Sequence, residues 1–188
     1  MKTARILALA AALGAAWPAS VPAATKLWFG THNVKRGDAE FTPFAGVLGF
    51  QEVEDSADKV KMRQSLPGYD RFVPKGDAGD VPIAWDRGRF ALVGKPHAVM
   101  THKGESGVTP SRWVNWVRLK VRRTGVKFFF VNTHFISKAW TKHPERRKRW
   151  KKHARVLRNE VAKLRATACR SSSPGTSTAA ASRSESRA

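Results

Sequence analysis

The chain has 188 residues, of which 41% are hydrophobic and seven are Trp, so it is long enough for one domain with a real core. Its 35 Lys and Arg residues against 14 Asp and Glu residues give a net charge of +21, which excludes an ordinary near-neutral protein. Because such a field attracts polyanions, nucleic acid is the first expected partner and an anionic membrane surface the second.

The first 23 residues have the pattern of a secretory signal peptide. Lys2 and Arg5 precede an apolar run over residues 6–17, and small residues up to Ala23 suit cleavage. We therefore expect a secreted or extracytoplasmic protein whose mature chain starts near Ala24, with an N-terminal membrane anchor as the alternative. No later stretch is apolar over the ~20 residues that a spanning helix needs.

Short apolar runs between turn residues predict a β-rich domain. The expected strands cover residues 26–33, 47–52, 69–73, 81–86 and 90–100. A short helix is expected at residues 57–65, where Pro67 and Gly68 stop it. Alternating residues at 113–121 and an apolar run at 126–134 flank a turn, which predicts a hairpin.

A long amphipathic helix is expected over residues 144–166. Its apolar stripe consists of Trp150, Ala154, Leu157, Val161 and Leu164. Its opposite face carries Arg147, Lys148, Lys151, Lys152, Arg155 and Arg158. Because few acidic residues are available to pair with it, this basic face favours phosphate contact over simple solvation.

Three of the expected strands end in polar residues suited to metal or phosphate chemistry. Asn33 ends the first strand, Glu52 follows the second, and His134 ends the second strand of the hairpin. A buried strand that ends in a carboxylate delivers it to the rim of a sheet, where a metal ion can be held. Taken singly, Asn33 also fits a turn and His134 a hydrogen-bonded strand end, but together they predict one site at one sheet edge.

Five short segments containing these residues follow one another along the chain. They are Thr31-His-Asn-Val34, Gly49-Phe-Gln-Glu-Val53, Pro82-Ile-Ala-Trp-Asp-Arg87, Ser111-Arg-Trp113 and Val131-Asn-Thr-His-Phe135. This series resembles the endonuclease/exonuclease/phosphatase superfamily, which includes the DNase I-like enzymes. The resemblance covers residues 26 to about 166. It implies a four-layer α/β sandwich with two central sheets and outer helices, and Mg²⁺- or Mn²⁺-dependent hydrolysis of phosphate esters.

The resemblance also assigns roles to four residues. Glu52 is similar to the metal-binding glutamate of the family, and Asn33 to the asparagine that orients the metal and the phosphate. His134 resembles the histidine that contacts a phosphate oxygen, and an imidazole suits proton transfer near neutral pH. Arg112 resembles an arginine that can clamp a phosphate. No Gly-rich loop indicates a nucleotide cofactor and no Cys/His cluster indicates zinc, and we expect a monomer.

The sequence departs from the family pattern after the long helix. The family carries a Gly-Asp-x-Asn motif there, and further on an Asp and a His that activate the water. This chain has no Asp after Asp86 and no His after His153. We therefore expect a partial domain at residues 24–167, incomplete at its C-terminus, and a disordered low-complexity tail at residues 168–188.

A frameshift hypothesis accounts for the composition of this tail. If the third base of each codon for residues 173–178 is read with the first two bases of the next, the shifted reading can be Ala-Gly-Asp-Phe-Asn. The gene's nucleotide sequence tests this hypothesis directly. An ordinary disordered tail is the alternative.

The expected function is that of a secreted, Mg²⁺-dependent phosphodiester hydrolase, a nuclease first of all. Because groups that act as one catalytic unit are lost together, we expect little or no activity from the chain as written. A non-catalytic, basic nucleic-acid-binding module is one alternative. A phosphatase or phospholipase of the same superfamily is another.

Overall fold

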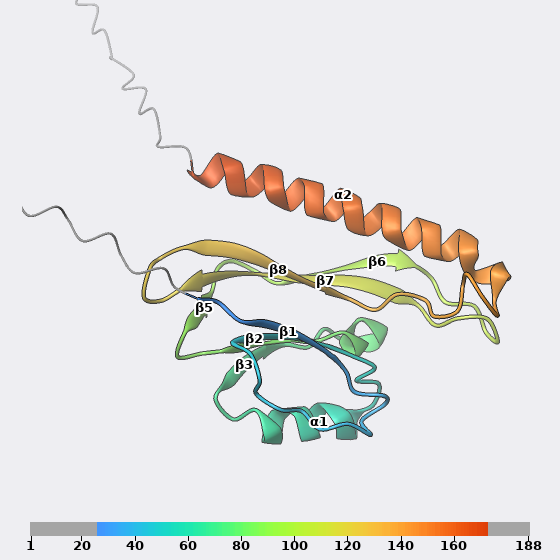
Figure 1. Ribbon diagram of the computed structural model, residues 1–188, viewed down its shortest axis with the longest axis horizontal. Coiled ribbons are helices and arrows are strands. Elements are labelled where there is room, and N and C mark those ends of the chain that lie inside the picture. Colours follow the sequence, from blue (N-terminus) through green and yellow to red (C-terminus); the bar gives the residue numbers. More distant parts are fainter. Residues whose placement is uncertain (1–25, 173–188) are drawn as a thin grey trace, which may run out of the picture.

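The computed structural model describes residues 26–172, which form four layers of helix, sheet, sheet and helix (Figure 1). The first half holds β1 (Phe29–Asn33), β2 (Val47–Gln51), α1 (Ser56–Ser65), β3 (Tyr69–Phe72), a 3₁₀ turn (Gly76–Asp80) and β4 (Ile83–Asp86). The second half holds β5 (Phe90–Leu92), β6 (His97–His102), β7 (Arg112–Val121), β8 (Lys127–Thr133), a 3₁₀ turn (Pro144–Arg146) and α2 (Arg147–Ser172). The expected four-layer α/β architecture is confirmed.

The edge strand β1 of the first sheet and the edge strand β8 of the second sheet lie on the same side of the molecule. The first sheet has the order β1-β2-β4-β3, with β1 parallel to β2 and the other pairs antiparallel. In the second sheet β7 is central and antiparallel to its neighbours, with β5 and β6 along one side and β8 along the other. Phe29 of β1 packs against Phe128 and Phe130 of β8, with ring centroids 5.4 and 6.0 Å apart.

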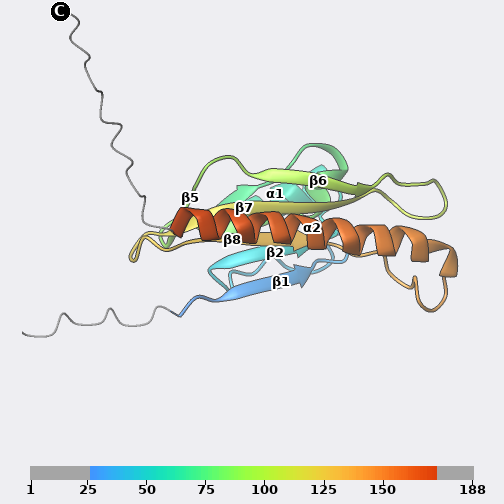
Figure 2. The same ribbon diagram turned by 90° about the horizontal axis from the view of Figure 1, so that it is seen from above.

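Two apolar clusters hold the layers together. One lies between α1 and the first sheet and includes Phe41, Leu48, Phe50 and Met62. The other lies between the two sheets and consists of Val47, Ile83, Trp85, Phe90, Val117, Leu119 and Val121. The alternation predicted for residues 113–121 explains this second cluster, because every second residue of β7 points towards the first sheet. α2 runs lengthwise over the outer face of the second sheet (Figure 2).

Two expected elements differ from those observed. The single strand expected at residues 90–100 is divided into β5 and β6, because Gly94 has a φ of 73° and the following Pro96 has no backbone N–H to donate. The long helix begins as a 3₁₀ turn at Pro144 and continues to Ser172, past the expected end at Ala166. The structure therefore places part of the expected tail in a helix, while the expectations for residues 1–25 and 173–188 lie outside the described residues.

The apolar stripe of α2 also differs from the expected one. His153 of α2 is fully buried, whereas Val161, which was expected in the stripe, is exposed. Neither described helix is long and apolar enough to cross a bilayer.

Candidate active site

The predicted polar residues meet where β1, β2 and β8 end. Because β1 and β2 are parallel and Asn33 is in register with Gln51, Asn33 lies beside the residue that follows β2. The Asn33 Nδ2 donates a hydrogen bond of 2.8 Å to the Glu52 Oε1. The His134 Nε2 lies 3.6 Å from the same oxygen. The structure thus brings Asn33, Glu52 and His134 together, as the sequence predicted.

Glu52 adopts an unusual backbone conformation at this point. Its φ is 62°, in the left-handed region that residues other than Gly seldom occupy. The chain is fixed on both sides, because Val34 N donates to the Gln51 carbonyl at 3.0 Å and Val53 N to the Asp80 carbonyl at 3.2 Å. A strained residue held in this way is a sign that its side-chain direction matters.

Arg112, at the start of β7, supplies a buried cation to the same site. Burial lowers the pKa of its guanidinium, and the carboxylates of Asp80, Glu52 and Glu54 oppose that shift. Its Nε is buried without a hydrogen-bond partner among the described residues. A guanidinium can bind a phosphate oxygen, and this role of Arg112 stays a prediction.

The surroundings of His134 favour its neutral form near pH 7. Burial lowers the pKa of its imidazole, the charge of Arg112 lowers it further, and Glu52 opposes both. Its Nδ1 is buried and has no partner in the part of the chain that the structure describes. A neutral imidazole can accept a proton at one nitrogen while the other holds one, as a general acid or base must.

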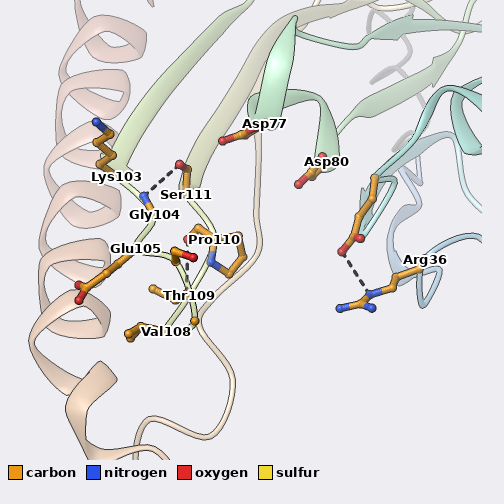
Figure 3. Close-up of a pocket in the computed structure, with 13 residues that line it drawn as sticks. Arg36, Asp77, Asp80, Lys103, Gly104, Glu105, Val108, Thr109, Pro110 and Ser111 are labelled. Carbon is orange, nitrogen blue, oxygen red and sulfur yellow. Dashed lines mark hydrogen bonds and ion pairs between the residues drawn. The ribbon is translucent and has the colours of Figure 1, made fainter.

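A pocket of about 750 Å³ adjoins this cluster, and sequence reasoning did not anticipate it (Figure 3). The loop at residues 103–111 forms one wall, Arg36 lies opposite it, and Asp77 and Asp80 lie between them. Glu54 also lines the pocket and pairs with Arg36 at 3.4 Å. Burial raises the pKa of Asp80 to about 6, with smaller contributions from its charged neighbours. The pocket is therefore lined by four carboxylates, counting Glu105, in a protein of net charge +21.

A buried amide pair beneath Glu52 connects the two sheets. The Gln51 Nε2 donates to the Asn132 Oδ1 at 2.8 Å and to the Thr31 Oγ1 at 2.9 Å. The Asn132 Nδ2 donates to the Phe50 carbonyl at 2.7 Å and the Pro82 carbonyl at 2.9 Å. These bonds hold the ends of β2 and β8 together. The sequence indicates this contact only through Asn132, a polar residue two positions after Phe130 on the inward face of a strand whose other inward residues are apolar.

Gly49 is needed for this amide pair to fit. A Cβ at residue 49 would lie 2.6 Å from the Asn132 Oδ1 and 2.7 Å from its Cγ. Because Asn132 is buried and hydrogen-bonded, we expect Gly49→Ala to cost about 1–3 kcal/mol of unfolding free energy, measured by urea denaturation. Gly68→Ala is the matched control, since nothing lies within 4 Å of the added Cβ. Equal stability of the two variants would contradict the proposed fit.

A second buried contact lies directly behind His134. The Thr133 Oγ1 donates to the Trp113 carbonyl at 2.6 Å and lies 2.7 Å from the Nε2 of His153 on α2. The His153 ring also stacks on Phe135, with centroids 4.2 Å apart. These contacts fix α2 against the end of β8, directly before His134. The sequence offered no metal-ligand spacing for His153, and its role here is to fix the helix.

His153 should make the stability depend on pH. Burial lowers its pKa to about 4, so between pH 6.5 and 4 the unfolded chain binds a proton that the folded chain does not. The contribution of His153 is therefore complete above pH 6.5 and declines as the pH falls, by up to about 3 kcal/mol. We expect His153→Gln to lose less stability than the wild type between pH 7 and pH 4.5 in urea denaturation. Parallel losses in the two proteins would show that His153 does not titrate in this way.

The donor set at Glu52 fits a hard divalent cation. Mg²⁺ prefers oxygen ligands and is commonly held by one or two carboxylates together with waters and substrate phosphates. Glu52 supplies the carboxylate, and Asn33 holds it in place through its Nδ2, while the Asn33 Oδ1 accepts a hydrogen bond from Lys35 N at 2.8 Å. Among residues 26–172, no group of three or more His, Cys, Asp or Glu side chains is placed to hold a metal ion, so water and phosphate oxygens would complete the shell.

Comparison with solved structures identifies the fold. An endonuclease/exonuclease/phosphatase family protein from Bacteroides thetaiotaomicron aligns over 73% of this chain and 59% of its own, with 20% identity and a TM-score of 0.56. A mannosyl-6-phosphatase from the same organism aligns over 74% of this chain and 60% of its own, with 21% identity and a TM-score of 0.57. No family model matches the sequence, and no curated protein matches it.

The chain therefore has the fold of the endonuclease/exonuclease/phosphatase superfamily, which confirms the fold expected from the five motifs. It spans about 60% of the length of these two structures.

Proposed function

We propose that this protein is a secreted, metal-dependent phosphodiester hydrolase and that its substrate is nucleic acid, DNA in the first place. The observation that carries the proposal is the convergence of Asn33 and His134 on one oxygen of Glu52, with Arg112 buried beside them. The net charge of +21 supports a polyanionic substrate.

Each of these side chains has a distinct task in phosphodiester hydrolysis. Arg112 binds a non-bridging phosphate oxygen with its guanidinium, and His134 hydrogen-bonds to the oxygen on which charge develops. Asn33 orients the Glu52 carboxylate through its 2.8 Å hydrogen bond. A Mg²⁺ or Mn²⁺ ion held by Glu52 would supply positive charge that offsets the negative charge building up on phosphorus.

The same residues imply weak activity for the chain as written. Within residues 26–172, the carboxylate beside the His134 imidazole is that of Glu52, which we assign to the metal, and the sequence has no Asp beyond Asp86. The Glu52 cluster can bind and polarise a phosphate, but in the described part of the chain it has no His–Asp pair to act as the base for the attacking water. We therefore expect at most trace cleavage from this chain.

Plasmid cleavage tests the proposal. We expect trace Mg²⁺-dependent nicking by the chain as written, and strong nicking by a version whose residues after Arg170 are translated from the shifted reading frame. EDTA should abolish both activities. A restored protein that binds DNA without cleaving it would favour the non-catalytic binding module instead.

The role of His134 in the reaction has its own test. His134→Ala in the restored version should lower the rate of nicking by roughly 10²-fold or more, the usual contribution of a positioned acid or base, with little change in DNA affinity. His143→Ala is the control, because His143 lies in the exposed turn before α2, where it contacts Glu145. A rate for His134→Ala close to that of the control would remove His134 from the mechanism.

A phosphomonoesterase is the second candidate, and the pocket in Figure 3 favours it. The carboxylates of this pocket can accept hydrogen bonds from a hydroxyl-rich group, and two of them, Glu54 and Glu105, are paired with Arg36 and Arg149. The similar mannosyl-6-phosphatase is consistent with a sugar phosphate of that kind. Faster release of phosphate from a hexose 6-phosphate than cleavage of DNA would establish this candidate.

A further inference from the structure

Trp140 is exposed in the turn that follows His134, between β8 and α2. Half of its surface, 51%, is accessible, although Ile136 and Ala139 nearby are buried. The turn is closed by backbone hydrogen bonds from Thr141 N and His143 N to the Lys138 carbonyl, at 3.2 and 2.9 Å. The ring is therefore presented to solvent from an anchored segment.

Three further contacts fix the Trp140 ring. The Trp150 ring meets it nearly at right angles, with centroids 5.6 Å apart, and Trp150 in turn contacts Phe135 at 5.1 Å. The guanidinium of Arg147 lies 5.4 Å from the Trp140 centroid and donates to the Ala139 carbonyl at 3.1 Å. The Lys151 ammonium lies 5.8 Å from the same centroid. A continuous row of rings thus leads from Phe135, next to His134, to the half-exposed Trp140.

We propose that Trp140, together with Arg147 and Lys151, is a stacking site for an unpaired nucleobase of a bound nucleic-acid strand. An aromatic ring flanked by cations matches a base and its phosphates, and such stacking contributes about 1–3 kcal/mol per base. This inference rests on the proposed function, because it names the form of nucleic acid that the site takes. A strand with unpaired bases should bind more tightly than a blunt duplex of equal charge.

The surroundings of Trp140 favour a base over a lipid surface. Between residues 135 and 160 it is the one large apolar side chain that is exposed, whereas insertion into a bilayer boundary needs a broad apolar face. The neighbouring positions are cationic, with Arg147, Lys148, Lys151 and Lys152 all exposed. The turn also lies at the end of the molecule where β8 ends and α2 begins, so a strand lying there can reach the Glu52 cluster (Figure 1).

The test compares the wild type and three variants on two oligonucleotides, with fluorescence anisotropy as the readout and EDTA present. Wild-type protein should bind an oligothymidylate about tenfold or more tightly than an abasic strand with the same phosphates. Trp140→Ala should bind the oligothymidylate more weakly by that same factor and the abasic strand as the wild type does. Trp140→Phe should restore most of the affinity. Trp28→Ala, which removes another exposed Trp, should change neither.

Three outcomes would overturn the inference. They are unchanged oligothymidylate binding by Trp140→Ala, an equal loss on the abasic strand, and Trp140-dependent binding to phosphatidylserine vesicles without oligonucleotide binding. Because no metal is present, none of these results depends on hydrolysis. A protein that stacks bases but never cleaves would leave this inference standing and refute only the proposed function.

Discussion

Glu52→Gln is expected to abolish most of the Mg²⁺-dependent cleavage in the version restored to the shifted frame. The substitution keeps the size of the side chain and its hydrogen-bonding capacity towards Asn33 but removes the charge that would hold the cation. Charge stabilisation by a bound metal is worth several kcal/mol, and each 1.36 kcal/mol is a factor of ten in rate. The rate of plasmid nicking should therefore fall by roughly 10²-fold or more.

Glu160→Gln provides the matched control for this experiment. Glu160 is also a glutamate with a charged partner, Lys163 at 2.6 Å. It lies in the middle of α2, away from the end of the helix that begins near His134. Its cleavage rate should equal that of the parent protein. Full activity of Glu52→Gln would mean that this strand-end carboxylate does not hold the metal.

Affinity for double-stranded DNA is expected to fall steeply with salt. The exposed face of α2 carries Lys148, Lys151, Lys152, Arg155 and Arg158. The acidic partners seen on this helix, Glu105 and Glu160, pair with Arg149 and Lys163 instead. A protein that contacts about six phosphates releases enough counterions to lose about 10³-fold in affinity between 50 and 200 mM salt. Fluorescence anisotropy with a duplex of arbitrary sequence measures this dependence.

The contribution of α2 can be separated from that of the overall charge. Changing Lys148, Lys152 and Arg155 to Gln should reduce the slope of log affinity against log salt by about three, one for each lost phosphate contact. A control triple variant of Lys59, Lys61 and Arg63 removes the same charge from α1, on the opposite side of the four layers. If both triple variants lowered the slope equally, the field of the whole protein rather than the α2 face would govern binding.

The strand ends could be predicted from the sequence because local patterns determine them. An apolar run followed by a polar residue fixes where each of β1, β2 and β8 ends, and the parallel pairing of β1 with β2 then sets Asn33 beside Glu52. The order of the five motifs supplied the fold. These features depend on short-range periodicity, which a sequence displays directly.

The missed features depend on contacts between distant segments. Asn132 bonds to carbonyls about 50 and 82 residues away in sequence, and Asp80 lies near Arg112 only because the two sheets pack face to face. His153 was assigned no role because its partner Thr133 belongs to another layer. The division of residues 90–100 into two strands required the positive φ of Gly94, which a run of apolar residues conceals.

Paramagnetic broadening by Mn²⁺ in NMR spectra of this chain tests whether Glu52 holds the metal, because it locates the metal without any need for catalysis. At substoichiometric Mn²⁺, the signals of the Asn33 side-chain amide and the His134 ring should broaden first, and Glu52→Gln should abolish this selectivity. Broadening centred on Asp77 and Asp80, or an unchanged pattern in Glu52→Gln, would contradict the assignment of Glu52 as the metal ligand.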